Sequence, residues 1–288
     1  MVSLRNYLKK KFPELNSSEI KLHIDSGACT INGRIEKIGS KEINLKKDRI
    51  VLRKLKKDFQ VPKLSVKEER IIYEDEHLLV YDKEAHYPCT ATANRKIPHL
   101  HGELRKFTKN NSLEAVHRLD KDTSGLIIFA KNQKVKNKLI EMFSKQEIHK
   151  EYEALVDGEL KLKKDKTKIE NELVLIDSSN NQQRWAVKQA SSKSKGKPAI
   201  TEVYIKKAKE DYSHVRLVPK TGRTHQLRVH MKSLGHPILG DKVYADSFKF
   251  KKAFARHVLH AMRLSFKHPI TEETLELEAP YPKDFKKS

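Results

Sequence analysis

The sequence of 288 residues contains little cysteine and no apolar stretch long enough to cross a membrane. Its two cysteines, Cys29 and Cys89, form no C-x-x-C pair, which argues against a disulfide framework and against a thiolate zinc site. The first eleven residues lack the apolar core of a secretory signal. We therefore predict a globular protein of the cytoplasm that keeps its thiols reduced.

Acidic residues are also scarce relative to basic ones. The chain has 38 Asp and Glu against 60 Lys and Arg, a formal net charge of +22. Such an excess favours a polyanionic partner, because cations that displace the counterions of phosphates bind nucleic acid whatever its sequence. The alternative is a basic surface that only keeps the protein soluble.

The amino-terminal part alternates short helical and extended patterns. Residues 3–11 predict a basic amphipathic helix, and the capping pattern of residues 16–19 predicts a second helix over 20–24. A strand and a tight turn are expected over 29–34, because Asn32-Gly33 readily adopts the positive φ of a hairpin. The charged residues 54–67 read as a linker.

The most informative stretch is His117-Arg118-Leu119-Asp120-Lys121-Asp122-Thr123-Ser124-Gly125-Leu126, followed by the apolar residues 127–130. It predicts a loop that delivers Asp120, flanked by cations, at the start of a buried strand. Taken alone, the same pattern also fits a charged surface loop in which Asp120 forms a turn.

Further elements follow from periodicity. We expect a hairpin over 71–83, a helix over 133–143, strands over 148–158, 202–205 and 213–218, and a helix after Gly222 that turns Leu227 and Met231 inward.

Two other kinds of site are weighed and set aside. His99 and His101, which we expect to alternate on a strand, could bind a metal with Glu103, but no further ligand completes the set. Ser124 could act as a hydrolase nucleophile, but the chain lacks the Gly-x-Ser-x-Gly pattern around it. We expect neither a metal site nor a hydrolase.

Several motifs resemble the RluA family of pseudouridine synthases. They are the stretch 117–126 with the trailing Ala130-Lys131, a Lys-x-Tyr-x-Ala-x-Val-x-Gly pattern over 150–158, Gly-Lys-x-Ala-x-Thr over 196–201, and the stretches 221–231, 235–241 and 260–266. The likeness spans residues 70–285. It departs from the family after Lys83, where Glu84-Ala85-His86 stands in place of Pro-x-Gly.

The amino-terminal pattern resembles the S4 RNA-binding domain. The resemblance implies an α+β protein with a small S4-like domain over 1–60. A pseudouridine synthase domain over 61–288 would follow it, built on a mixed, largely antiparallel β-sheet flanked by helices.

The family resemblance implies conversion of uridine to pseudouridine in RNA without a cofactor, with Asp120 as the catalytic residue. Whether Asp120 attacks C1′ or assists glycal formation stays open. A guanidinium should keep Asp120 charged; we expect Arg223 in this role, with Arg228 as the competitor. Tyr152 would stack on the uracil and could mediate removal of the C5 proton.

The remaining predicted site residues bind substrate. Arg118 would fill the gap left by the flipped nucleotide, Leu227 would wall the pocket, and His117 and Arg228 would line it. Ribosomal RNA of the large subunit is the expected substrate. A transfer RNA enzyme and a non-catalytic RNA-binding assembly factor are the alternatives. We expect a monomer.

Overall fold

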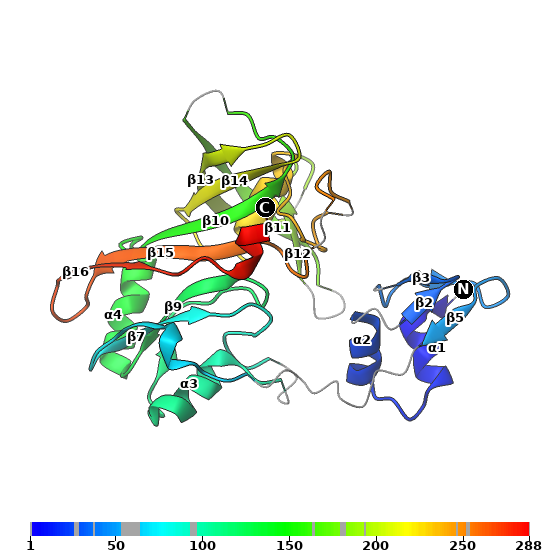
Figure 1. Cartoon of the computed structure of the whole chain (residues 1–288), viewed down its shortest axis with the longest axis horizontal. Coiled ribbons are helices and arrows are strands. Elements are labelled where there is room, and N and C mark those ends of the chain that lie inside the picture. Colours follow the sequence, from blue (N-terminus) through cyan, green and yellow to red (C-terminus); the bar gives the residue numbers. More distant parts are fainter. Residues whose placement is uncertain are drawn as a thin grey trace. The chain divides into compact units, whose positions relative to one another are not determined.

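The computed structural model divides the chain into two units, residues 1–63 and 64–288 (Figure 1). It describes residues 2–25, 29–36, 38–52, 64–92, 97–162, 165–178, 183–192, 194–245, 247–251 and 254–287. The predicted boundary at residue 60, and most of the predicted linker, fall on residues 53–63, which lie outside the described residues.

The smaller unit packs two helices and short strands around one apolar core. Its elements are β1 (Val2–Ser3), α1 (Leu4–Lys11), α2 (Ser17–Asp25), β2 (Cys29–Ile31), β3 (Arg34–Ile35), β4 (Glu42–Ile43) and β5 (Ile50–Leu52). Both predicted helices are confirmed. The second begins with a reciprocal cap, in which Asn16 Oδ1 accepts from the Glu19 backbone and Glu19 Oε2 accepts from the Asn16 backbone.

The predicted hairpin of this unit is confirmed. Asn32 and Gly33 have φ of 51° and 81° between β2 and β3, the pair of positive values that a two-residue hairpin turn requires. β2 also pairs with β5, so the strands form the order β3-β2-β5.

The larger unit is organised by one eleven-stranded sheet, and the fold class expected from the sequence is confirmed for it. The strands are β6 (Ile71–Glu74), β7 (Leu78–Lys83), β8 (Glu114–Ala115), β9 (Ser124–Ala130), β10 (His149–Asp157), β11 (Lys166–Asp177), β12 (Arg184–Val187), β13 (Lys197–Ala208), β14 (Tyr212–Pro219), β15 (Leu259–Lys267) and β16 (Thr274–Glu278). The main order is β12-β11-β13-β14-β10-β15-β9-β7-β6. Among the described pairs, only β9 and β15 run parallel.

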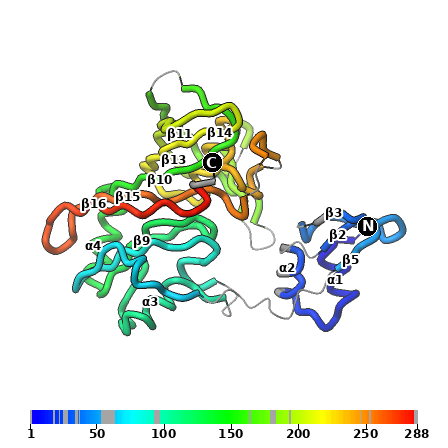
Figure 2. Tube along the Cα trace, in the orientation of Figure 1, coloured from blue at the N-terminus to red at the C-terminus, as the bar shows by residue number. Residues whose placement is uncertain are grey.

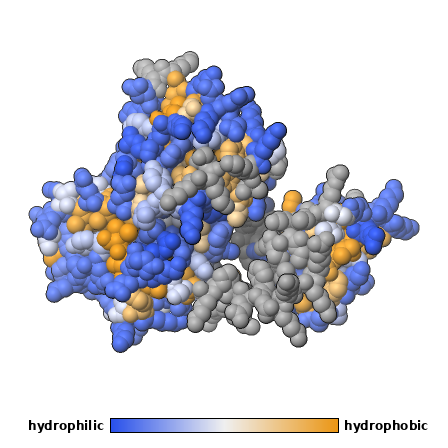
Figure 3. Space-filling model, viewed as in Figure 1, coloured by the Kyte–Doolittle hydropathy of each residue, from blue (hydrophilic) through white to orange (hydrophobic). Residues whose placement is uncertain are grey.

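Among its described residues, this unit has the helices α3 (Leu100–Thr108), α4 (Gln133–Ser144) and α5 (Gln226–Ser233), besides the 3-10 turns η1 (Glu68–Arg70) and η3 (Lys283–Lys287). Figure 2 follows β10, β15 and β9 side by side through the centre of the unit. Much of the face seen in Figure 3 is hydrophilic, as expected for a chain this rich in charge. No helix within the described ranges is long and apolar enough to span a membrane.

The strand expected at His99 and His101 is wrong. His99 caps α3, its Nδ1 accepting from the backbone of Gly102 at 3.1 Å, and His101 lies on the helix with Nε2 2.6 Å from the carbonyl of Leu113. Leu100 and Leu104, both buried and four residues apart, decide the helical period.

The parallel pairing of β9 with β15 sets the position of the loop before β9. Their parallel register pairs Gly125 with Ala261. Gly125 has φ +110°, and a Cβ there would lie 2.2 Å from the Ala261 carbonyl oxygen. Only glycine allows this approach, which explains the Ser-Gly sequence at the end of the Asp120 loop.

Candidate active site

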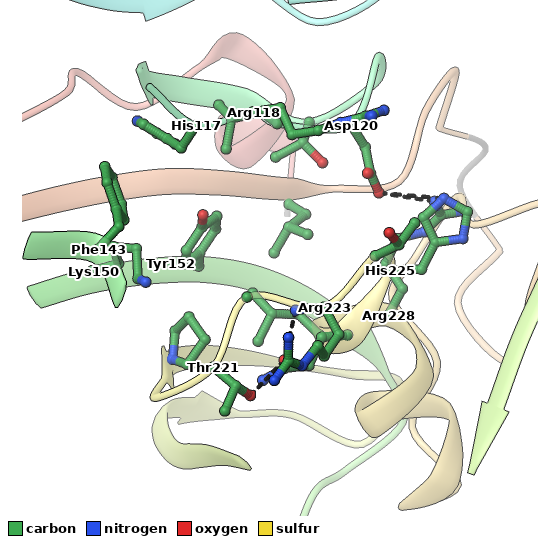
Figure 4. A pocket seen from close by; sticks show the side chains of 18 of the residues that line it. His117, Arg118, Asp120, Phe143, Lys150, Tyr152, Thr221, Arg223, His225 and Arg228 are labelled. Carbon is green, nitrogen blue, oxygen red and sulfur yellow. Dashed lines mark hydrogen bonds and ion pairs between the residues drawn. The ribbon is translucent and has the colours of Figure 1, made fainter. Parts of the chain in front are cut away.

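A cavity of about 430 Å³ opens beside Asp120 in the larger unit. Its walls come from the loop before β9, the first half of β10 and the segment leading into α5. Figure 4 shows Arg118 and Asp120 along one side of this space and Thr221 along the other, with Tyr152 between them. The structure brings all seven predicted site residues to this cavity: His117, Arg118, Asp120, Tyr152, Arg223, Leu227 and Arg228.

Buried contacts fix the loop that carries Asp120. Lys83 is 1% exposed, and its ammonium donates to the carbonyls of Glu84, Tyr87 and Lys121 at 2.9, 2.9 and 3.0 Å. Burial lowers the pKa of Lys83 to about 8, so all three donors are present at neutral pH. The departure from the family pattern after Lys83 therefore leaves this lysine able to anchor the loop.

The carboxylate of Asp120 is 23% exposed and is held through one of its oxygens. Arg228 Nη1 donates to Oδ2 at 3.1 Å, and His225 Nε2 lies 3.7 Å from the same oxygen. No described residue hydrogen-bonds to the other oxygen, Oδ1. One edge of the carboxylate is thus fixed, and the other is open to a bound molecule.

Asp120 stays ionised in this position. Burial alone would raise its pKa, but His225 and His257 favour the charged form when they are protonated, the charge and hydrogen bond of Arg228 favour it at any pH, and the pKa lies below its usual value. Burial also lowers the pKa of His225, and that of His257 to about 4. Arg228 is therefore the neighbour that remains charged at neutral pH.

The structure corrects the expected partner of Asp120 from Arg223 to Arg228. The Arg223 Nε donates to the carbonyl of Pro198 at 2.9 Å. Arg228 is 6% exposed and forks onto Asp241, with Nε and Nη2 at 2.7 and 2.8 Å from its two oxygens, while Nη1 reaches Asp120. A guanidinium held by two carboxylates is a preorganised donor.

The start of α5 determines which arginine faces Asp120. We expected Gly222 to permit the turn into this helix, but φ is positive at His225, at 56°, and not at Gly222. The helix begins at Gln226, whose buried side chain accepts from the backbone of Arg223 and from Thr221 Oγ1. Arg223 consequently stays in the loop, whereas Arg228 is held on the helix.

The other part of the cavity combines aromatic rings with one cation. Burial and the charge of Asp120 raise the pKa of Tyr152, so its phenol stays protonated. Lys150 Nζ lies 5.3 Å from the ring centroid of Phe143. His117 accepts from the Ile128 backbone through Nε2 at 2.9 Å, and burial lowers its pKa to about 3, so the ring is neutral.

Ser124 has histidine and arginine neighbours but no access to the cavity. It is 4% exposed, and its hydroxyl lies 2.9 Å from His260 Nδ1 and accepts from Arg256 Nη2 at 3.0 Å. It does not line the cavity. These contacts give Ser124 a structural role in the crossing of β9 and β15, and they argue against the hydrolase alternative.

Sequence reasoning missed three residues that support the site. Asp241 holds Arg228, Lys83 holds the loop, and His257 Nε2 lies 2.8 Å from Thr123 Oγ1. Asp241 follows Gly240 in one of the quoted motifs, so an acid beside a tight turn was a usable signal. The other two are recognisable only from the fold.

The comparisons with known proteins agree with this geometry. The sequence model of the RNA pseudouridylate synthase family matches residues 77–233. The solved structure of human RNA pseudouridylate synthase domain containing 1 superposes with a TM-score of 0.61 at 27% identity, over 77% of this chain and 85% of that one. The fold is thus that of an RNA pseudouridine synthase.

Two curated relatives identify the family within the pseudouridine synthases to which the chain belongs. Ribosomal large subunit pseudouridine synthase D of Neisseria meningitidis is 33% identical over 96% of this chain and 75% of its own length. Dual-specificity RNA pseudouridine synthase RluA of Pasteurella multocida is 39% identical over 73% of this chain and 92% of its own. The chain belongs to the RluA family of these enzymes.

Proposed function

We propose that this enzyme converts uridine to pseudouridine in ribosomal RNA of the large subunit, with Asp120 as its catalytic residue. The observation that carries the catalytic assignment is the half-open carboxylate, fixed at Oδ2 by Arg228 and free at Oδ1 inside the cavity. Relatives named as large-subunit enzymes cover nearly the whole chain, which supports the choice of RNA.

The reaction needs few groups. The N1–C1′ bond breaks, the uracil turns, C5 joins C1′, the C5 proton leaves and N1 takes up a proton, so that atoms and electrons balance without a cofactor. Asp120 Oδ1 serves either as the nucleophile at C1′ or as the base that removes a ribose proton. Tyr152, protonated and beside Asp120, offers its ring for stacking on the uracil.

Arg118 and Arg223, the cavity arginines other than Arg228, have different roles in this proposal. Arg118 is exposed beside Asp120 and lines the cavity, where it would take the place of the flipped nucleotide. Arg223, also exposed, would contact a phosphate of the same strand. Leu227, 7% exposed, forms part of the apolar wall.

We further propose that residues 1–60 are an S4-like domain that grips structured RNA. The two helices and the hairpin support this, as do Lys9, Lys10 and Lys11 in the last turn of α1, which are exposed. Replacing Lys9 and Lys10 by Gln should weaken RNA binding several-fold and reduce its salt dependence, with turnover of bound RNA unchanged. Unchanged affinity and salt dependence would contradict the assignment.

We also propose that the enzyme is a monomer and that it acts in the cytoplasm. Light scattering tests the oligomeric state, and cell fractionation tests the location.

The first experiment maps pseudouridine in ribosomal and transfer RNA by carbodiimide treatment and primer extension. Cells lacking the gene are compared with cells given the wild type or Asp120→Asn. We expect large-subunit sites to be lost and to return only with the wild type, while the variant still binds RNA. Sites lost only from transfer RNA would overturn the choice of substrate, and restoration by Asp120→Asn would overturn the role of Asp120.

A further inference from the structure

His225 has a geometry that the proposed chemistry leaves unexplained. It has a left-handed backbone, with φ 56°, although it is not a glycine. Its ring is 14% exposed, with Nδ1 2.9 Å from the hydroxyl of Tyr244 and Nε2 3.7 Å from Asp120 Oδ2. A strained residue whose side chain is braced and turned toward a reacting group is a candidate for function.

The hydrogen bonds around Tyr244 define which nitrogen of His225 carries a hydrogen. The backbone of Trp185 donates to the Tyr244 hydroxyl oxygen at 3.0 Å. Burial raises the pKa of Tyr244 to about 12, so the phenol keeps its hydrogen, and among the described contacts of the hydroxyl the acceptor for it is His225 Nδ1. Burial also lowers the pKa of His225, which leaves the ring neutral. Its single hydrogen is then on Nε2, facing Asp120.

Tyr244 couples this brace to the other partner of Asp120. The guanidinium carbon of Arg228 lies 5.0 Å from the centroid of the Tyr244 ring, so one aromatic side chain contacts both residues that approach Oδ2. A separation of 3.7 Å is longer than a hydrogen bond, but catalytic hydrogen bonds often shorten when substrate binds.

We propose that His225 is a positioning residue that acts through Asp120, its Nε2–H completing a pair of donors on Oδ2. One donor alone lets the carboxylate rotate about its Cβ–Cγ bond, whereas two donors on the same oxygen direct Oδ1 at the ribose. This rests on the proposed role of Asp120, and it adds the braced unit of His225 and Tyr244 to the site.

Two matched variants distinguish this role of the His225 side chain from a role of its backbone conformation alone, because the two roles predict opposite orders of activity. Asn tolerates positive φ and places its amide where Nδ1 lies, so it suits the turn and keeps the Tyr244 contact. Gln suits the turn less well but can place its amide nitrogen where Nε2 lies, facing Asp120. If Nε2 is what matters, His225→Gln is the more active variant and His225→Asn the more stable one.

The test uses the full chain and RNA from cells lacking the gene, labelled with tritium at uridine C5, because pseudouridine formation releases that hydrogen. Single-turnover release is measured with the wild type, His225→Gln, His225→Asn, Tyr244→Phe and Asp120→Asn, together with RNA affinity and thermal midpoint. We expect His225→Asn to lose roughly tenfold in the rate constant, with unchanged affinity, and His225→Gln to stay within about threefold of the wild type. Tyr244→Phe should lose several-fold, because His225 is no longer braced.

Each outcome has a defined meaning. His225→Asn as active as His225→Gln, or more so, overturns the inference. If both His225 variants fail to fold, Tyr244→Phe decides, since full activity there also overturns it. Failure of the proposed function shows separately, as tritium release by Asp120→Asn.

Discussion

Two carboxylates of the larger unit, Asp120 and Glu153, are enclosed by cations and polar hydrogens but are bonded very differently. Glu153 on β10 is 1% exposed, and both of its oxygens are occupied. Lys206 approaches Oε1 at 2.6 Å, and His214 and Tyr281 each approach Oε2 at 2.6 Å. Asp120 is 23% exposed and is held at Oδ2 only.

The difference separates a structural carboxylate from a reactive one. Glu153 ties β13, β14 and the carboxyl-terminal segment to β10, and it has no oxygen left for a ligand. Asp120 has a permanent charge partner but one open oxygen in a cavity. Bonding saturation, rather than pKa direction, distinguishes the two, because the pKa of both lies below the usual value.

The largest expected effect is the loss of turnover when Arg228, the charge partner of Asp120, is replaced. Arg228→Lys removes the planar fork that reaches Asp241 and Asp120 together, and an ammonium cannot replace it. We expect turnover to fall by roughly a hundredfold or more and the free energy of unfolding to fall by about 3 kcal/mol. Tritium release and urea unfolding measure the two. Arg263→Lys, in an exposed pair with Glu278, is the control and should change neither; near-normal turnover of Arg228→Lys would contradict the role of the fork.

The converse change is made at the saturated carboxylate. Glu153→Gln leaves Lys206 without its buried anion, so we expect the free energy of unfolding to fall by about 2 kcal/mol while turnover stays unchanged. Chemical denaturation and tritium release are again the measurements. Glu141→Gln, in an exposed pair with Lys145, should leave the free energy of unfolding nearly unchanged. A loss of turnover at constant stability would mean that Glu153 takes part in the reaction.

A third test of the comparison uses acid. Despite burial, hydrogen bonds from His214, Lys206 and Tyr281 lower the pKa of Glu153 from 4.5 to about 2 in the folded protein. Because this value is below the unfolded one, the contribution of Glu153 to stability is complete above about pH 5 and is lost as the pH falls toward 2. The wild type should therefore lose its stability advantage over Glu153→Gln across that range, as urea midpoints will show. A constant difference would refute the paired state.

The smallest expected effect concerns the opposite case, a cation with no anion beside it. Lys150 lines the cavity and makes no hydrogen bond or ion pair within the described part of the chain, and burial lowers its pKa. If Lys150 binds a phosphate of the RNA, Lys150→Gln should raise the Kd for RNA several-fold and leave the turnover of bound RNA unchanged. The slope of log K against log salt concentration should become smaller in magnitude by about 0.7 to 0.9. Lys134→Gln, exposed on α4 and outside the cavity, should leave both values unaltered; an unchanged slope for Lys150→Gln would mean that it binds no phosphate.

The sequence was sufficient for much of the fold and for the residues of the cavity. The strand over 148–158 showed its alternation and the one before Lys131 its apolar run, whereas β11 gave no such signal, and Asp120 and Tyr152 belonged to long motifs. The choice between Arg223 and Arg228 failed because it depends on where α5 begins, and hence on the left-handed conformation of His225. Neither residue type nor spacing reveals that conformation.

The histidines at the start of α3 show a second reason. The alternation of His99, Leu100 and His101 suggested a strand, but Leu100 and Leu104 are buried together, and that packing outweighed the local pattern. Lys83 and His257 likewise owe their roles to contacts across long stretches of chain. Such contacts follow from the topology and are not visible in any local window.

The pairing of Gly125 with Ala261 has a consequence for the time at which activity appears. Ser124 and its partner His260 are 136 residues apart, and a growing polypeptide leaves the ribosome from its amino end. A nascent chain therefore displays Asp120 long before β15 exists to fix the strand behind it. The support of the Asp120 loop by β15 (Leu259–Lys267) can form only after that strand has been made, so a copy that stops before it holds the motif without the strand that positions it.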